Sequence, residues 1–521
     1  MYLFLMAYNK NKMTKNIKRP TVLVKGVLAS LLLLSVGCSY EAPEIPEPEV
    51  QTLQDADISN TVFLGGSLFS GVNNGVLVED LSAQSIPQIF LNSVANNTQQ
   101  VDFSATSSNT IGFNIFENGP NVNGIVGPYQ LTFPPGADTT FFQEFVNGQA
   151  FAYAPVNTEI KNYSFPKAQV LDFTQASRTE NTFINSYLNA GAQAPLAQIA
   201  GSQPSFFVLN LGYEDLLGYS VTGAEGNEDQ ADATAHAYGD ILNTAVFESN
   251  LTAVVDALLA NPNAKGALLN IPDFLKFPFF TETEFDITPY VIGLQTKLSN
   301  MRSAASDYND VLETYYEQNP GFPFADRRPI LTYPGDSPFT WGIQVEDRDL
   351  HDVVVNGEPL KKVRQAVRDE LIYYRHEQFL TSTIGNLPEN AVPESQYIKL
   401  AEIDIIRAKI AEYNQAIQQV AAASNGRLVV VDIYSYFEEL YTGFNQFLDV
   451  PAEGTTIEGV QFLPIVGEFG IFSADALNLN QRGNALIVNQ IVDALNLNFN
   501  GNLSRVNPND FAGTPINIAG N

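Results

Sequence analysis

The sequence predicts an α/β fold in which helices cover both faces of a mostly parallel β-sheet. Short β-branched or aromatic runs bounded by turn residues alternate with longer stretches in which apolar residues recur at spacings of three and four. This alternation is typical of parallel sheets, because each crossover helix packs back on the sheet. A chain of 521 residues, 45% of them hydrophobic, can build a full core as one large or two smaller domains.

The expected elements follow the chain in order. Strands are predicted at 61–64, 205–211, 267–271 and 427–433. Helices are predicted at 290–317, 361–379, 400–423 and 484–495. The segments 98–160 and 274–395 are too long for simple connections, so we expect insertions that decorate the sheet.

The first 37 residues have the pattern of a lipoprotein signal peptide. Six basic residues and no acidic ones lie between positions 10 and 25, and the apolar run 26–36 leads to Leu34-Ser-Val-Gly-Cys38. The run is too short for a comfortable membrane span. Cys38 is the only cysteine of the chain, so it is the expected site of lipid attachment. The alternative is an uncleaved membrane helix with an incidental cysteine.

An acidic, proline-spaced segment follows the cysteine. Glu41, Glu44, Glu47 and Glu49 alternate with prolines, so residues 38–58 are predicted to form an extended tether between the anchor and a folded body at 59–515. An anionic membrane surface repels a tether of this charge. We therefore expect display on the cell surface rather than a plain linker.

The charge balance excludes nucleic acid as a partner. Six of the 27 Lys and Arg residues belong to the signal peptide, so 21 basic residues face 57 acidic ones and the mature net charge is −36. With no cysteine after Cys38, disulfides and thiolate metal sites are excluded too.

No metal or cofactor site is predicted. His236, His351 and His376 have no second histidine at metal-ligand spacing, so surface or packing roles are favoured over a place near a reactive serine. The acidic run 225–232 offers oxygen ligands to calcium but lacks EF-hand spacing, so a solvated loop is the favoured interpretation.

Four blocks of the sequence resemble those of the GDSL/SGNH hydrolase family. Gly65-Gly66-Ser67-Leu68 follows a strand and is similar to the block that carries the nucleophile, with Ser67 at the nucleophile position. The resemblance implies a flavodoxin-like parallel sheet between helices, with the blocks converging at the carboxyl ends of neighbouring strands.

The other three blocks depart from the family at the positions that carry its chemistry. Lys167 stands where the family has a glycine whose N–H binds the oxyanion, and Glu214 replaces an asparagine amide that does the same. Asp475 keeps the position of the carboxylate that orients the base, but Asn478 replaces the histidine. An amide cannot accept a proton near neutral pH, so the resemblance implies a degenerate site. A lysine and a glutamate there are expected to pair and fill the former oxyanion hole.

The resemblance is strongest for lipoprotein members from Bacteroidetes-type bacteria. It rests on Leu68 to Gly71, Asp215-Leu-Leu-Gly-Tyr219, Asn270-Ile-Pro-Asp273 with Pro278-Phe-Phe-Thr281, and Val506-Asn-Pro-Asn509, in that order along the chain. In such lipoproteins, acidic residues just after the cysteine resemble a signal for export to the outer leaflet.

Two functions compete on these grounds. The first is a catalytically dead, lipid-anchored, surface-exposed outer-membrane lipoprotein that acts as a scaffold or binding subunit of a β-barrel complex for transport, secretion or barrel assembly. The alternative is an active serine esterase that uses Ser67 on acyl or acetyl-carbohydrate esters. Clustered aromatic residues at 279–280, 322–324, 373–374 and 434–441 indicate either a contact surface or the packing of the insertion.

Overall fold

The computed structural model describes residues 51–521 with the exception of 76, 78–83, 95–125, 133–141, 148–160, 177–180, 182–183, 185–193, 292–293, 333–340, 374–382, 447–450 and 518–521. Contacts divide the chain into residues 1–50 and 51–521. The predicted signal peptide, Cys38 and the predicted tether up to residue 50 therefore lie outside the described residues, as does His376. In the described part of the chain, no helix has the length and apolar character needed to cross a membrane.

Five parallel strands form the central sheet, in the order β13-β6-β5-β1-β4. Their bounds are β1 Thr61–Gly65, β4 Asn162–Ser164, β5 Phe206–Asn210, β6 Lys265–Leu269 and β13 Leu428–Val431. Taken in chain order the strands are arranged 2-1-3-4-5, which is compatible with a flavodoxin-like fold. The order reverses between β1 and β5, and this switch point is where open α/β sheets place their ligands.

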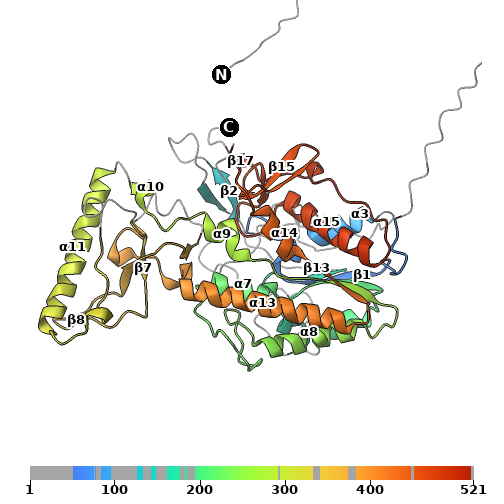
Figure 1. Ribbon diagram of the computed structural model, residues 1–521, viewed down its shortest axis with the longest axis horizontal. Helices are drawn as coiled ribbons and strands as arrows, with labels where there is room; N and C mark the ends of the chain where they lie inside the picture. Colours follow the sequence, from blue (N-terminus) through green and yellow to red (C-terminus); the bar gives the residue numbers. More distant parts are fainter. Residues whose placement is uncertain are drawn as a thin grey trace, which may run out of the picture. The chain divides into compact units, whose positions relative to one another are not determined.

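Helices cover both faces of this sheet, so the predicted α/β architecture with a parallel sheet is confirmed. Figure 1 shows α8 (Thr244–Leu258) and α13 (Leu400–Ala423) on one side, with α3 (Ile86–Ser93) and α15 (Gln481–Asn498) on the other. The strands are buried on both faces, with every residue of β1 and β5 inaccessible to solvent. Phe247 of α8 stacks on Tyr413 of α13 with ring centroids 4.0 Å apart, which joins the two helices.

The strongly periodic elements lie where the sequence predicts them. Helix α13 has the predicted bounds, and its exit is set by Asn425 and Gly426, both in the left-handed region that ends helices. Helix α15 begins three residues earlier than expected because Asn480 caps it by accepting the N–H of Gly483 at 3.0 Å. The predicted strand 427–433 is too long, since Asp432 caps helix α14 (Ile433–Leu440) directly after β13.

Residues 51–58 belong to the folded body rather than to the tether. Leu53 is buried and forms a bridge with Gly501, and the N–H of Asp55 donates to the carbonyl of Phe499 at 3.2 Å. The boundary of the folded body therefore lies near residue 50, eight residues before the predicted one.

The insertion predicted at 274–395 has its own hydrophobic core. Buried residues from its long helix α11 (Gln295–Gln318) and from strands β7 (Gln344–Glu346) and β10 (Val363–Gln365) meet there, among them Met301, Leu312, Ile343, Val345 and Val363. Figure 1 shows α11 beside β7 and β8 (Val354–Val355). The predicted helix 290–317 is present as α10 (Thr288–Val291) followed by α11.

The predicted helix 361–379 is wrong. Its described part forms β10, which pairs with β7, and β11 (Leu371–Ile372), which pairs with β12 (Tyr397–Ile398). Arg364 explains the difference, because its guanidinium binds the buried carboxylates of Asp347, at 2.5 Å, and Glu370, at 2.6 Å. These contacts fix an extended backbone that the local spacing of apolar residues does not reveal.

Four residues of the aromatic clusters are buried, which favours packing over a contact surface for Phe279, Phe280, Tyr373 and Phe437. Phe279, Phe280 and Tyr373 pack together in the main core. The hydroxyl of Tyr373 also donates to the carbonyl of Ser220, so it joins the insertion to the body. Phe324, which also lies in the insertion, is not buried, and 85% of its surface is exposed.

The insertion predicted at 98–160 is described only in part. Within it, β2 (Val126–Thr132) pairs antiparallel with β3 (Phe142–Asn147), and β17 (Ile516–Asn517) adds to β2 in parallel. This small sheet brings a segment near the carboxyl end of the chain to the first insertion.

Candidate functional site

Ser67, Lys167 and Glu214 lie together at the switch point of the sheet, as predicted. Ser67 starts the short helix α1 (Ser67–Ser70) one residue after β1, Lys167 follows β4, and Glu214 is the second residue of α7 (Tyr213–Val221) after β5. Three neighbouring parallel strands thus bring these residues to one edge, although 147 positions separate Ser67 from Glu214.

The Glu214 carboxylate is held by two donors. Its Oε2 accepts the backbone N–H of Ser67 at 3.0 Å, and its Oε1 accepts the hydroxyl of Tyr238 at 2.8 Å. Burial raises the pKa of Glu214, and the hydrogen bonds from Ser67 and Tyr238 and the charge of Lys167 oppose that rise. Ser67 itself is 5% exposed and Glu214 2% exposed, so the pair is shielded from water.

The second backbone donor at the site is also engaged. The N–H of Lys167 donates to Oγ of Ser67 at 3.2 Å. Lys167 has φ 61°, in the left-handed region that favours glycine, which agrees with the family's glycine at this position. The backbone N–H at position 167, which the resemblance assigns to the oxyanion, is therefore occupied by Ser67, and the backbone N–H of Ser67 is occupied by Glu214.

The expected ion pair between Lys167 and Glu214 is replaced by contacts through Tyr238. The Lys167 ammonium lies over the Tyr238 ring, 5.2 Å from its centroid. The same tyrosine donates its hydroxyl to Glu214, and burial keeps its pKa well above the ordinary value, so the phenol remains a donor. Sequence reasoning missed Tyr238, which lies in an irregular loop with no periodic pattern to mark it.

Gly66 and Glu214 fit each other. A Cβ atom at Gly66 would lie 2.7 Å from Oε2 and 2.8 Å from Cβ of Glu214, closer than such atoms can approach. Position 66 carries no side chain, and position 214 carries a longer one than the asparagine that the resemblance implies. The two residues are complementary in volume, a link that becomes visible only in three dimensions.

Asp475 and Asn478 retain the geometry of an orienting pair without a base. Nδ2 of Asn478 donates to Oδ2 of Asp475 at 3.0 Å, as an imidazole N–H would. Asp475 also accepts the backbone N–H groups of Gly75 at 2.6 Å and of Asn478 at 2.7 Å. Burial raises the pKa of Asp475, and these hydrogen bonds oppose the rise. The far end of the amide offers only a neutral carbonyl oxygen to a serine.

The charges of both Glu214 and Asp475 act on the hydroxyl of Tyr213. Burial raises the pKa of Tyr213 first, and the charges of Glu214 and Asp475 raise it further. The bond of Asp475 to the N–H of Gly75 ties its loop to the segment that follows α1. Direct contact between Asn478 and Ser67 stays a prediction.

The histidines have structural partners. His236 is buried, and its Nε2 lies 3.2 Å from Oε1 of Gln169, two residues beyond Lys167. His351 packs on Phe322 with ring centroids 4.4 Å apart, and burial lowers its pKa.

The acidic run 225–232 is occupied by contacts within the protein. Asp229 pairs with Lys409 at 2.9 Å, and Asp232 accepts the N–H of Thr234 at 2.9 Å. Among the residues that the structure describes, no group of three or more His, Cys, Asp or Glu is placed to hold a metal.

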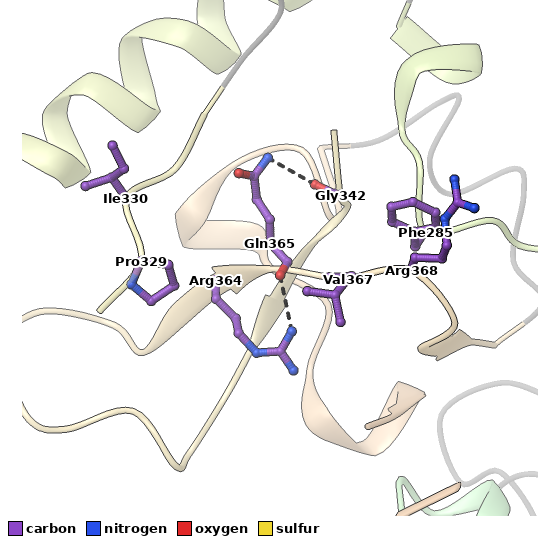
Figure 2. Close-up of a pocket in the computed structure, with 9 residues that line it drawn as sticks. Phe285, Pro329, Ile330, Gly342, Arg364, Gln365, Val367 and Arg368 are labelled. Carbon is purple, nitrogen blue, oxygen red and sulfur yellow. Dashed lines mark hydrogen bonds between the residues drawn. The ribbon is translucent and has the colours of Figure 1, made fainter. Parts of the chain in front are cut away.

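Two hollows open elsewhere in the described part of the chain. One, of 460 Å³, lies within the insertion, and Figure 2 shows it between Phe285, Pro329 and Ile330 on its sides and Val367 and Arg368 beyond β10. The other, of 400 Å³, opens at the carboxyl ends of β6 and β13. A comparison with family models, with curated proteins and with solved structures finds no match to this chain.

Proposed function

We propose that the protein is a non-catalytic, lipid-anchored outer-membrane lipoprotein with an SGNH-hydrolase-like fold. The observation that carries this proposal is the Glu214 carboxylate on the N–H of Ser67. An oxyanion hole must offer donors to developing negative charge, and here a carboxylate accepts from the first donor while Ser67 Oγ accepts from the second, at Lys167. Loss of one such donor costs roughly a hundredfold to a thousandfold in rate, and Asn478 removes the base as well.

Treatment with a fluorophosphonate and with short acyl-nitrophenyl esters tests this proposal. We expect no covalent labelling of Ser67, and no turnover above that of Ser67→Ala. A serine-dependent rate or a labelled Ser67 would overturn the non-catalytic function.

A scaffold role on an outer-membrane β-barrel protein follows as the second part of the proposal. Five of the ten large hydrophobic side chains that are exposed in the described residues belong to 274–395, namely Leu294, Phe324, Ile330, Val354 and Val367. Exposed apolar side chains of this kind are typical of protein contacts. Ile330 and Val367 line the hollow of Figure 2, which makes this side of the insertion the candidate contact surface.

Purification of the native lipoprotein in mild detergent tests the scaffold role. We expect a β-barrel protein to co-purify, and the triple variant Phe324→Ser, Ile330→Ser and Val367→Ser to lose it. Leu497→Ser is the matched control, because Leu497 is 82% exposed but lies on α15 in the body. A lone monomer, or equal loss in both variants, would exclude this contact surface.

One observation favours the alternative of an active esterase. Glu214 lies beside the serine, where it accepts the backbone N–H of Ser67 at 3.0 Å, and burial raises its pKa. A carboxylate of raised pKa can act as a general base. If Glu214→Gln abolishes a Ser67-dependent esterase rate, the site is active with glutamate as its base.

A further inference from the structure

The hollow at the carboxyl ends of β6 and β13 is built from three elements. Asn270 and Asp273 follow β6, Asp432 and Tyr434 follow β13, and one face of α13 supplies Arg407, Ile410, Ala411 and Asn414. The two strands are adjacent and parallel, with Leu269 opposite Val431, so their ends open at one edge of the sheet. This edge is the side on which parallel α/β sheets bind ligands.

Hydrogen bonds fix two walls of this hollow. Asn414 accepts the N–H of Ile271 at 2.7 Å and donates to its carbonyl at 2.8 Å. Asn270 donates to Asp432 at 2.7 Å and accepts the N–H of Tyr434 at 2.8 Å. Both side-chain amides therefore form hydrogen bonds within the protein and hold the strand ends in place. Other groups must bind a ligand in this hollow.

Only one of the two carboxylate oxygens of Asp273 has a hydrogen-bond partner among the described residues. Its Oδ2 accepts from Nε of Arg407 at 3.1 Å, whereas its Oδ1 is buried with no hydrogen-bond partner among the described residues. Asp273 is 7% exposed, and a buried acceptor without a hydrogen-bond partner destabilises the folded state. A donor supplied from outside the chain would satisfy it.

The charges around the hollow are already bound within the protein. Arg407 pairs with Asp273 at 3.1 Å, and Asp432 accepts from Asn270 at 2.7 Å and from the hydroxyl of Ser435 at 2.7 Å, so a neutral ligand with hydroxyl groups fits this lining. A hydroxyl can donate to a carboxylate and accept from a guanidinium at once, and Arg407 is half exposed, so its guanidinium is free to turn toward a ligand. Tyr434, 36% exposed, adds an aromatic surface, and Ile410 and Ala411 add an apolar one.

We propose that this hollow binds a neutral carbohydrate through one pyranose ring. A hydroxyl of the sugar donates to Asp273, a neighbouring hydroxyl accepts from Arg407, and the apolar face of the ring lies against Tyr434. A volume of 400 Å³ falls within the range of small-molecule sites. The proposal is independent of Ser67, which lies at the ends of other strands.

Saturation-transfer NMR on the full lipoprotein tests the proposal, in a detergent without a sugar head group. The probes are methyl α-mannopyranoside, methyl β-galactopyranoside and N-acetylglucosamine, each added alone. We expect saturation transfer to at least one of them. Absence of transfer to all three would overturn the proposal, as would a response to calcium chloride in its place.

Variants locate the binding. Arg407→Gln should raise the dissociation constant of the sugar that binds about tenfold or more, because one charged hydrogen bond is lost. Tyr434→Ala should reduce transfer to the ring protons. Arg505→Gln is the control, because Arg505 is also an exposed arginine paired with an aspartate, Asp493, outside the hollow. Equal affinity in Arg407→Gln and the native protein would place the sugar elsewhere and overturn the proposal.

Discussion

The carboxylate of Glu214 accepts the backbone N–H of Ser67 at 3.0 Å, so an acidic side chain occupies the donor beside the serine hydroxyl. The contact requires the absence of a side chain at Gly66, and it leaves the Glu214 carboxylate between two donors, Ser67 and Tyr238. This arrangement is stable without a ligand, because the carboxylate itself satisfies the groups that an oxyanion would otherwise require.

Gly66→Ala should destabilise the protein by about 1–3 kcal/mol, because the new Cβ would collide with Glu214. Urea unfolding measures the change. Gly201→Ala is the control, since a Cβ at Gly201 meets nothing within 4 Å, and it should be nearly neutral. If Glu214→Ala does not relieve the cost of Gly66→Ala in a double-mutant cycle, the clash is not its cause.

Lys167→Gly should be more stable than Lys167→Ala by about 1 kcal/mol, because only glycine adopts φ 61° without strain. Gln203, at φ 50° and exposed, provides the same pair of substitutions away from the site. A similar difference at both positions assigns the effect to the backbone. Equal stabilities of the two Lys167 variants would contradict the backbone explanation.

Asn478→His should not restore esterase turnover by itself, since the two backbone donors at Ser67 and Lys167 remain occupied. Adding Glu214→Asn supplies an amide donor and frees the N–H of Ser67, and the double variant should exceed the single one by about a hundredfold. Hydrolysis of nitrophenyl acetate is the measurement, with Ser67→Ala in each background. Turnover by Asn478→His alone would show that the occupied donors do not block the chemistry.

Stability should fall as pH rises from about 4.5 to about 7 in part because of Glu402. Burial raises the pKa of Glu402 from 4.5 to about 7, so in this window the folded state keeps a proton that the unfolded state has lost. Glu402→Gln keeps an acceptor for the N–H of Lys399. The variant should lose about 1 kcal/mol less unfolding free energy over this pH range than the native protein, a small value because the side chain of Glu402 is partly exposed.

Urea unfolding at pH 4.5 and pH 8 tests this dependence. Glu412→Gln on the same helix is the control, because the hydrogen bond from Thr244 lowers the pKa of Glu412 and its titration lies below the window. An unchanged slope in Glu402→Gln would contradict the assignment.

Cys38→Ser should release the protein from the membrane and abolish labelling with a radioactive fatty acid, because the apolar run 26–36 is too short to serve as the anchor. Fractionation of cells after alkaline extraction checks the result. Continued integral behaviour of the variant would indicate an uncleaved helix instead.

The local parts of the fold could be predicted from the sequence, and the long-range parts could not. Strand β1 and helix α13 carry their own signal in β-branched and periodic residues, and both lie at the predicted positions. Strand β4 spans three residues at the sheet edge, too short to be recognised, and β10 depends on ion pairs of Arg364 with distant carboxylates. Family resemblance gave the position of Ser67 and Glu214, but no pattern in the sequence indicates Tyr238.

The bond between Gly75 and Asp475 has a consequence for the order of assembly. It joins residues 400 positions apart, as does the bond that the N–H of Ala474 donates to Oδ1 of Asn74. Contacts of such separation form late, because closing so long a loop costs entropy before it yields any gain. During synthesis, the Ser67 region is therefore closed only after the segment around Asp475 has been made. A protein shortened before Asp475 would leave the loop 73–75 without its partner, in a form open to proteases and chaperones.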